Sequence, residues 1–441
     1  MRKKSNKQLP LSAPVIDHPQ ALEMEAISRI LDRNATITDL LLQELCKGTQ
    51  PKPTGAEGMS AEQVFRVALV KQMFGFSYQQ LAFHLADSMS LQRFCRIGIA
   101  GRVFKKSALA KNIKRLSAKT LEAINQTLTG VGKQDGVEKG RKVRIDSTVV
   151  ESNIHHPTDS SLLYDSVRVL SRILGATGLR FTNHCRRAKR RMMAIINARK
   201  QKERVAAYKD LLKVTEKTVG YAQRGIEQLE DRGDLQAMIA CMELKRFVPL
   251  AMRVMDQSRR RVIEGYTVPA AEKVVSIFEP HTDVIVKDRR ETYFGHKVCL
   301  TVGQSQLITD CLITEGNPAD SDLTLMMIDR QKEIYGRYPL KVALDGGFAS
   351  KDNLSAAKSR GIKDVCFAKK RGLTVERMCR SQWVYDRLRR FRAGVESVIS
   401  WLKRALGFDR CMWKGRRSFG SYVWLTVVTA NLKVLARAAT E

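Results

Sequence analysis

The stretch RRFRAGVESVISWLK, residues 389–403, predicts an amphipathic helix. At about 100° per residue, the charged side chains of this helix share one narrow face, and they are Arg389, Arg392, Glu396 and Lys403. The apolar side chains form a stripe about 90° away, made of Val395, Ile399, Leu402 and the following Leu406. We expect the helix to pack on a core and to present a carboxylate, flanked by cations, at its rim.

The charged face of this helix allows two interpretations. Arg392 and Glu396 are spaced i,i+4, which suits an ion pair on a solvated surface. The alternative is a binding or catalytic site, which requires that other carboxylates of the chain meet Glu396. The positions of the remaining acidic residues therefore decide between the two.

The charge of the chain points to a polyanionic partner. The 441 residues include 77 Lys and Arg against 45 Asp and Glu, a net charge of +32. Nucleic acid is the commonest partner of such a chain. A membrane is the competing partner, but the sequence has no apolar run of about 18 residues and no basic helix with an aromatic face. The least polar late stretch, Tyr422–Ala436, contains Thr, Asn and Lys and predicts a buried helix.

The cysteines and the start of the chain indicate an intracellular protein without structural metal. Nine cysteines are scattered with no CxxC and no Cys/His ligand spacing, which argues against zinc and disulfides. The start, MRKKSNKQLPLSAP, has no apolar segment after its charges. It is therefore interpreted as a basic tail and not as a secretory signal.

The first 135 residues are expected to be helical where they are ordered. Residues 1–58 carry several prolines and predict a basic, loosely ordered segment with one helix near Ala21–Leu45. Residues 59–135 predict a compact all-helical domain, in which Ser60 caps a helix that Gly75 ends. A helix-turn-helix that binds DNA fits this pattern, but so does any small helical domain.

The pattern changes to that of a strand after a linker at residues 136–140. KVRIDSTVVESNI, residues 142–154, predicts a strand with Asp146 in its middle. Burying an unpaired carboxylate costs several kcal/mol, so Asp146 is expected either to face solvent at a sheet margin or to hold a cation. Asp159 is expected to cap a helix that begins near Leu162. A turn role is preferred to metal ligation for the neighbouring histidines, His155 and His156.

Residues 162–261 predict almost continuous helix, with a break at 231–234. Within it, Arg180–Arg204 contains ten Lys or Arg and one Glu. A solvated helix face is one interpretation, but the excess of cations favours a track for DNA phosphates. The residues expected to contact DNA there are Arg186, Arg187, Lys189, Arg190 and Arg191.

Strand patterns return after residue 273. Strands are predicted at VVSIF (274–278), HTDVIVKDR (281–289), and in the two segments up to residue 316, before a helix from about residue 320. KVALDGGFAS, residues 341–350, predicts a buried strand that ends at Asp345. Ligand-binding groups of α/β folds lie at such strand ends, although an Asp held by turn amides is the alternative.

Three carboxylates thus belong to strand, strand and helix elements of one α/β region. Their local sequences, DSTVV around Asp146, ALDGGF around Asp345 and the R-(3)-E-(6)-K spacing of Arg392, Glu396 and Lys403, resemble bacterial insertion-sequence transposases of the DDE type, in particular the ISNCY-like group. That family has a ribonuclease-H-like core and a Y-(2)-R-(3)-E-(6)-K signature. The resemblance covers most of residues 60–441.

The resemblance implies a set of functional residues and partners. Asp146, Asp345 and Glu396 are expected to bind two Mg²⁺ ions, which Mn²⁺ can replace, and Arg392 and Lys403 to contact DNA phosphates. Arg389 stands where the signature has tyrosine, and a cation there is compatible with a DNA contact. The partners implied are terminal inverted repeats, target DNA and a second copy of the chain, in the bacterial cytoplasm at the nucleoid.

The same resemblance sets the expected domain organisation. A ribonuclease-H-like domain is expected at 136–441, with a helical insertion at about 162–261 between the first strand and the later ones. The predicted function is cleavage at element ends and strand transfer into target DNA. A nuclease that does not join strands and a catalytically inactive DNA-binding protein of the same fold are the alternatives.

Overall fold

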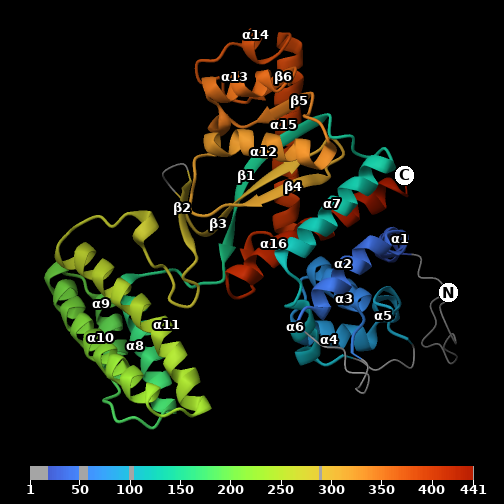
Figure 1. The fold of residues 1–441 in the computed structure, drawn as a ribbon. Helices are drawn as coiled ribbons and strands as arrows, with labels where there is room; N and C mark the ends of the chain where they lie inside the picture. Colours follow the sequence, from blue (N-terminus) through green and yellow to red (C-terminus); the bar gives the residue numbers. More distant parts are fainter. Residues whose placement is uncertain (1–17, 49–57, 99–103, 288–290, 441) are drawn as a thin grey trace, which may run out of the picture.

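A mixed β-sheet lies at the centre of the chain (Figure 1). The computed structural model describes residues 18–48, 58–98, 104–287 and 291–440. In these residues the strand order is β2-β3-β1-β5-β6, with β4 beside β3 and β7 beside β1. β3 is antiparallel to β1, whereas β5 is parallel to it. The strands are β1 (Lys142–Ser152), β2 (Asp283–Lys287), β3 (Glu291–Val302), β4 (Ile308–Ile313), β5 (Lys341–Leu344), β6 (Asp364–Phe367) and β7 (Arg410–Cys411).

Helices cover both faces of this sheet, as predicted for a ribonuclease-H-like α/β core. The alternation of β1 turns Arg144 and Asp146 towards α15 (Gln382–Leu406), where both bond to side-chain or backbone groups of that helix. The next residue, Ser147, faces the opposite side and bonds to Asp320 at the start of α12 (Asp320–Tyr335). The shorter helices α13 (Lys351–Ser359) and α14 (Val375–Met378) flank β6.

A bundle of helices is inserted between β1 and β2, which confirms the predicted helical insertion. It has its own apolar cluster, and it projects away from the sheet (Figure 1). The predicted break at 231–234 is also confirmed, because Asp234 caps the last helix through the backbone N–H of Ala237. The helices are α8 (Asp159–Ala176), α9 (Cys185–Asn197), α10 (Gln201–Glu230) and α11 (Leu235–Ser258).

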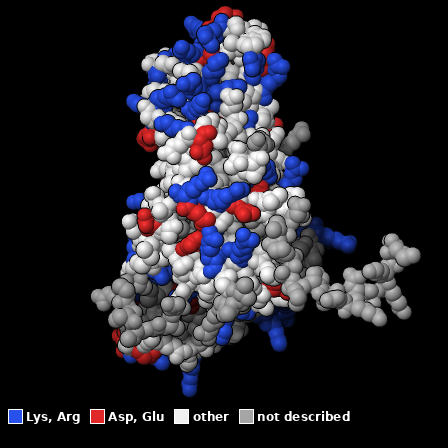
Figure 2. Space-filling view, turned by 90° about the vertical axis from the view of Figure 1, so that its right-hand side faces the viewer, with Lys and Arg blue, Asp and Glu red and all other residues white. Residues whose placement is uncertain are grey.

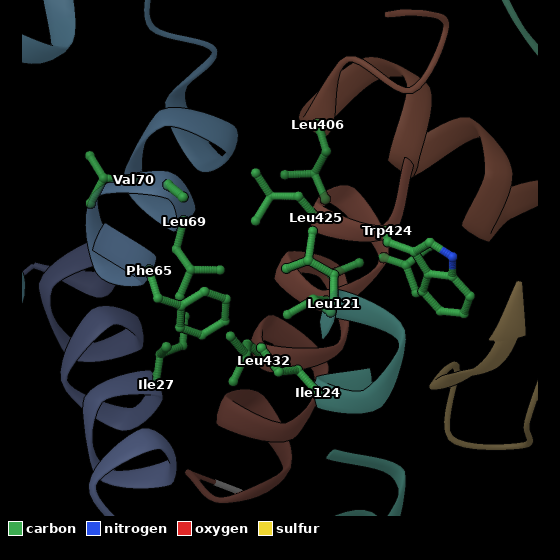
Figure 3. Packing of buried hydrophobic residues seen from close by; sticks show 14 of the residues in the cluster. Ile27, Phe65, Leu69, Val70, Leu121, Ile124, Leu406, Trp424, Leu425 and Leu432 are labelled. Atoms are coloured by element: carbon green, nitrogen blue, oxygen red, sulfur yellow. The ribbon is translucent and has the colours of Figure 1, made fainter. Parts of the chain in front are cut away.

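The N-terminal helices share a core with the last helix of the chain, α16 (Arg416–Ala438). Figure 3 shows Phe65 and Leu69 facing Leu425 and Leu432 of α16. α16 is long and apolar enough to cross a membrane, but 89% of its apolar window is buried within the fold. The prediction of a buried helix there is confirmed. The N-terminal helices are α1 (Pro19–Arg33), α2 (Ala35–Cys46), α3 (Ala61–Phe74), α4 (Tyr78–Asp87), α5 (Met89–Phe94), α6 (Lys106–Ile113) and α7 (Ala118–Gln134).

The prediction of a single helix in a loosely ordered N-terminal segment was wrong for residues 19–46. Two helices meet at Asn34, which is not helical, and both bury apolar side chains against the shared core, among them Ile27 and Leu41. α1 packs on α16 at the other end of the chain, and α2 packs on α3 and α7, so the local sequence does not reveal these partners. The basic tail predicted at the start of the chain lies outside the described residues. The predicted cap at Ser60 and helix end at Gly75 are both confirmed.

Two further local predictions were wrong. VVSIF (274–278) is not a strand, because Val274 and Ile277 pack into the cluster of the insertion. The Gln257 side chain satisfies both backbone groups of Val274. Asp159 does not cap α8, since Thr158 does so. Asp159 instead accepts hydrogen bonds from Gln257 and Arg261 at the far end of the insertion.

A chain of hydrogen-bonded acids and histidines ties the end of the insertion to the sheet. His281 Nε2 lies 2.8 Å from Glu279 Oε2, and His281 Nδ1 lies 2.8 Å from His296 Nε2. His296 Nδ1 lies 2.8 Å from Asp283 Oδ2. Glu279 also accepts from the backbone of Gly415, before α16. The three side-chain bonds need three N–H protons, and two neutral imidazoles carry only two. One imidazolium therefore completes the chain, whereas a second imidazolium would set two N–H groups against each other at the contact between His281 and His296.

Acidification below about pH 6.5 is expected to weaken this chain of hydrogen bonds. Burial lowers the pKa of His281, its hydrogen bond to Glu279 partly opposes this, and the charges of His296 and Arg416 lower it further. His281 therefore takes up a proton less readily in the folded state than in the unfolded state. The hydrogen-bonded chain stabilises the fold fully at a pH above the pKa that His281 has in the unfolded state. This stabilisation is lost progressively as the pH falls below that pKa. Melting temperatures between pH 7.5 and 5.5 measure the loss.

The variant His281→Gln isolates this titration. A glutamine can donate to Glu279 and accept from His296 without taking up a proton, so its melting temperature should depend less on pH than that of the wild type. His156→Gln, at an exposed position, is the matched control and should keep the wild-type dependence. An unchanged pH dependence in His281→Gln would contradict the prediction.

Candidate active site

The register of β1 and β5 brings two predicted carboxylates together. The strands are parallel, and their last paired residues are Ile145 and Leu344. The residue that follows each of them is an aspartate, which is Asp146 within β1 and Asp345 directly after β5. Because neighbouring strands lie about 4.8 Å apart, the two side chains are adjacent at the carboxyl end of β5. This edge of the sheet is where α/β folds place ligand-binding groups.

Two glycines shape the turn that follows Asp345. A Cβ atom on Gly346 would lie 2.6 Å from Cβ of Lys369, and one on Gly347 would lie 2.8 Å from Oδ2 of Asp320. Both distances are shorter than real contacts, so the turn needs glycine at both positions. The glycines thus let a lysine and a further carboxylate lie against the turn that follows Asp345.

The predicted helix at 389–403 is confirmed as the central part of α15. Ser381 caps its start, Gly407 ends it, and Val395 and Leu402 are fully buried. Gly394 lets the helix approach β1, because a Cβ there would lie 2.1 Å from Nη1 of Arg144. Nη1 of Arg144 donates to the carbonyl of Phe391 at 3.0 Å. This close approach fixes the next turn of α15 directly above Asp146.

Arg392 is the side chain that connects the three predicted carboxylates. Its Nη2 lies 2.9 Å from Asp146 Oδ2 and 3.4 Å from Asp345 Oδ1, and its Nη1 lies 2.6 Å from Glu396 Oε1. The arginine side chain is 14% exposed and the Glu396 side chain 63% exposed. The i,i+4 pair of Arg392 and Glu396 therefore exists, but it is part of a larger cluster and not a simple surface pair.

The cluster combines one guanidinium with three carboxylates. If all four groups are ionised, its net charge is −2, which attracts further cations. Within the described part of the chain, no three Asp, Glu, His or Cys side chains are close enough together to hold one metal ion. The guanidinium occupies the space between the acids. In chemical type, the donor set of three carboxylates fits Mg²⁺, which prefers oxygen ligands.

The cations on the predicted face of α15 occupy different environments. Arg389 is exposed, whereas Lys403 is half-buried. Figure 2 shows one face on which Lys and Arg gather over the upper part of the molecule, where Figure 1 places α13, α14, β6 and α15. Exposed basic residues there include Lys363, Lys369, Lys370, Arg371, Arg377, Arg380, Arg387, Arg389 and Arg390.

The predicted basic track lies on α9, in the insertion, and its five cations fall into two groups. Arg187 and Arg191 both bond to Asp210 of α10. Partial burial would raise the pKa of Asp210, but these two hydrogen bonds lower it below the usual value. The other three cations are exposed and form no ion pair within the described residues, and they are Arg186, Lys189 and Arg190.

The sequence alone did not identify three residues near the site, which are Asp320, Lys297 and Lys369. Asp320 accepts hydrogen bonds from Ser147 Oγ (3.0 Å) and Lys297 Nζ (3.2 Å), and Lys369 lies against Gly346. The Asp at the start of a helix and the Lys within a strand carry no signal of their own, since both patterns are common on surfaces. Lys369 belongs to the basic run 369–371, whose sequence gives no sign that it lies beside a carboxylate.

Two family models match the chain. One, described as "Transposase DDE domain", matches residues 260–432, and another, described as "Transposase domain (DUF772)", matches residues 17–115. No curated protein and no solved structure matches the chain. The first match includes Asp345, Arg392 and Glu396, whereas Asp146 lies before it. The second match includes α1 and α3, which pack on α16, but it ends before α7, which also packs on α16.

Proposed function

The chain belongs to the insertion-sequence DDE transposases, and from this premise we propose that Asp146, Asp345 and Glu396 are its catalytic carboxylates. The enzyme is a DNA transposase of the polynucleotidyl-transferase type. The observation that supports the assignment is the cluster around Arg392, in which the three acids come from two adjacent strand ends and the helix above them. Membership of the ISNCY-like group stays a prediction.

The three carboxylates are suited to hold divalent cations. Two Mg²⁺ ions, or Mn²⁺ ions in their place, would activate the attacking water or 3′-hydroxyl and stabilise the leaving oxygen when bound. Asp146 and Asp345 stand on the rigid sheet, and Asp146 is further fixed by the backbone N–H of Ser147, which donates to Oδ1 at 2.8 Å. Glu396 is more exposed, so it has the freedom to adjust as ligands enter.

The neighbouring residues position these acids and bind DNA. Asp320 joins the start of α12 to Ser147 on β1 and to Lys297 on β3, which holds the turn after Asp345 in place. Arg389, Arg392 and Lys403 are assigned to DNA phosphates beside the cleaved bond. The cations of α9 are assigned to DNA farther from it, and they are Arg186, Arg187, Lys189, Arg190 and Arg191.

The arrangement of the chain on DNA follows from the same assignment. Residues 59–135 are proposed to bind the terminal inverted repeats, and residues 136–441 to carry catalysis, with the insertion at about 162–261 extending the DNA contact. Bringing two element ends and a target together requires at least a homodimer in the complex. The place of action is then the bacterial nucleoid.

The test is an assay for joined DNA. The protein is incubated with Mg²⁺, labelled DNA from both sides of its coding region and a target plasmid, and the products are separated by size. Joined strands are expected from the wild type and from Asp352→Asn, an exposed control on α13, but not from Asp345→Asn. Cut strands without joining would identify a nuclease, and binding without cutting would identify a regulatory protein.

A further inference from the structure

We propose that Arg392 is an exchangeable cation, which occupies the carboxylate cluster in the metal-free enzyme and leaves it for a DNA phosphate when divalent ions bind. This inference rests on the proposed function of the three acids. It adds a coupling between metal loading and DNA binding, carried by one side chain.

The contacts of Arg392 show that it takes the place of a metal ion. Its two terminal nitrogens bond to Asp146, Asp345 and Glu396 at 2.6–3.4 Å. A Mg²⁺ ion needs its oxygen ligands at about 2.1 Å, which is closer than a guanidinium between them permits. Consistent with this, no three ligand-type side chains of the described residues have the spacing for a metal. The present position of Arg392 and a loaded metal site therefore exclude each other.

The binding of Arg392 is incomplete, which favours exchange. Its Nε atom is buried and has no hydrogen-bond partner in the described residues, and one guanidinium compensates only one of three carboxylate charges. Divalent ions supply more charge to the same oxygens. Arg392 projects from the same face of α15 as the exposed Arg389, so a displaced guanidinium remains at the surface assigned to DNA.

A phosphate is the appropriate new partner for the displaced side chain. The planar guanidinium binds carboxylates and phosphates with the same bidentate geometry, so the exchange replaces one set of charged hydrogen bonds by another. Metal ions would then strengthen DNA binding through Arg392, and DNA would strengthen metal binding to the same extent, because coupling between two sites is reciprocal.

Metal titration without DNA tests the first half of the exchange. Mn²⁺ binding to the wild type, Arg392→Gln and Arg389→Gln is measured by calorimetry. Removing the competing guanidinium should raise the Mn²⁺ affinity of Arg392→Gln by about tenfold or more, because each charged hydrogen bond that the metal must break is strong. Arg389→Gln removes the same charge from the same helix, but not from the cluster, and should change the affinity much less.

DNA binding with and without Ca²⁺ tests the second half of the exchange, in which Arg392 binds a DNA phosphate. Ca²⁺ occupies carboxylate sites and is used here to limit cleavage during the measurement. The wild type should bind end DNA more tightly when Ca²⁺ is added, by about fivefold or more. Arg392→Gln should lose most of this gain, whereas Arg389→Gln, although it binds DNA more weakly with and without Ca²⁺, should keep it. Arg392→Lys, whose single ammonium cannot bridge three acids in the same way, should give intermediate results in both titrations and serves if Arg392→Gln does not fold.

The outcomes separate the inference from the function on which it rests. If the wild type has no Mn²⁺ site that is lost in Asp146→Asn, the assignment of the acids fails. If that site exists but Arg392→Gln binds Mn²⁺ as tightly as the wild type or more weakly, the exchange is overturned and Arg392 is a fixed structural partner of the acids. An equal gain from Ca²⁺ in the wild type and in Arg392→Gln also overturns it.

Discussion

Asp146→Asn is expected to lower Mg²⁺-dependent strand transfer on the order of 10³-fold, since metal ions in such sites supply several kcal/mol of transition-state stabilisation. Asparagine keeps the size of the side chain and an oxygen that can accept from Ser147, but it removes the negative charge that a metal ion requires. The Asp146 side chain is only 12% exposed, so water cannot easily substitute for it. The variant should fold like the wild type and, in the absence of divalent ions, bind DNA like it.

Strand transfer under single-turnover conditions measures this effect, with DNA affinity in the absence of divalent ions as a parallel readout. Asp320→Asn is the matched control, because Asp320 lies on the opposite side of β1 and its amide oxygen can still accept from Ser147 and Lys297. It should lose at most about tenfold, as a positioning residue. A rate for Asp146→Asn within tenfold of the wild type would remove Asp146 from the catalytic set.

The elements that carry the three acids were predictable because each has a strong local signal. The run of β-branched residues around Asp146, the glycine turn after Asp345 and the helical period of 389–403 all gave the correct element type. The order of the predicted elements along the chain also gave the correct position of the helical insertion, between β1 and β2. Such patterns depend only on neighbouring residues, so no other part of the fold is needed to interpret them.

The arrangement around Arg392 was not predictable from these patterns. Helical spacing pairs Arg392 with Glu396, but its contacts to Asp146 and Asp345 depend on the register of β1 with β5 and on the close approach of α15 at Gly394. Neither this register nor this close approach can be deduced from the periodicity of a local sequence. The same reason explains the misinterpreted VVSIF segment, whose apolar side chains found a helical bundle as their partner and not a sheet.

The triple variant Arg186→Gln/Lys189→Gln/Arg190→Gln is expected to lower DNA affinity on the order of 10²-fold at low salt, with little dependence on DNA sequence. These three exposed side chains on α9 form no ion pair within the described chain, so their charge is available to phosphates. Each lost phosphate contact should also reduce the slope of log affinity against log salt by about 0.9, which gives a total reduction of nearly 3.

The paired arginines of α9 provide the control that separates phosphate contacts from general charge. Arg187→Gln/Arg191→Gln removes two cations that already bond to Asp210, and their charge is partly compensated before DNA arrives. We expect this variant to lose less affinity per cation removed and to change the salt slope by less than 1. Filter binding or fluorescence anisotropy between 50 and 300 mM salt measures both variants. If both variants change the salt slope by the same amount per cation removed, DNA displaces Asp210 and all five cations of α9 bind phosphates alike.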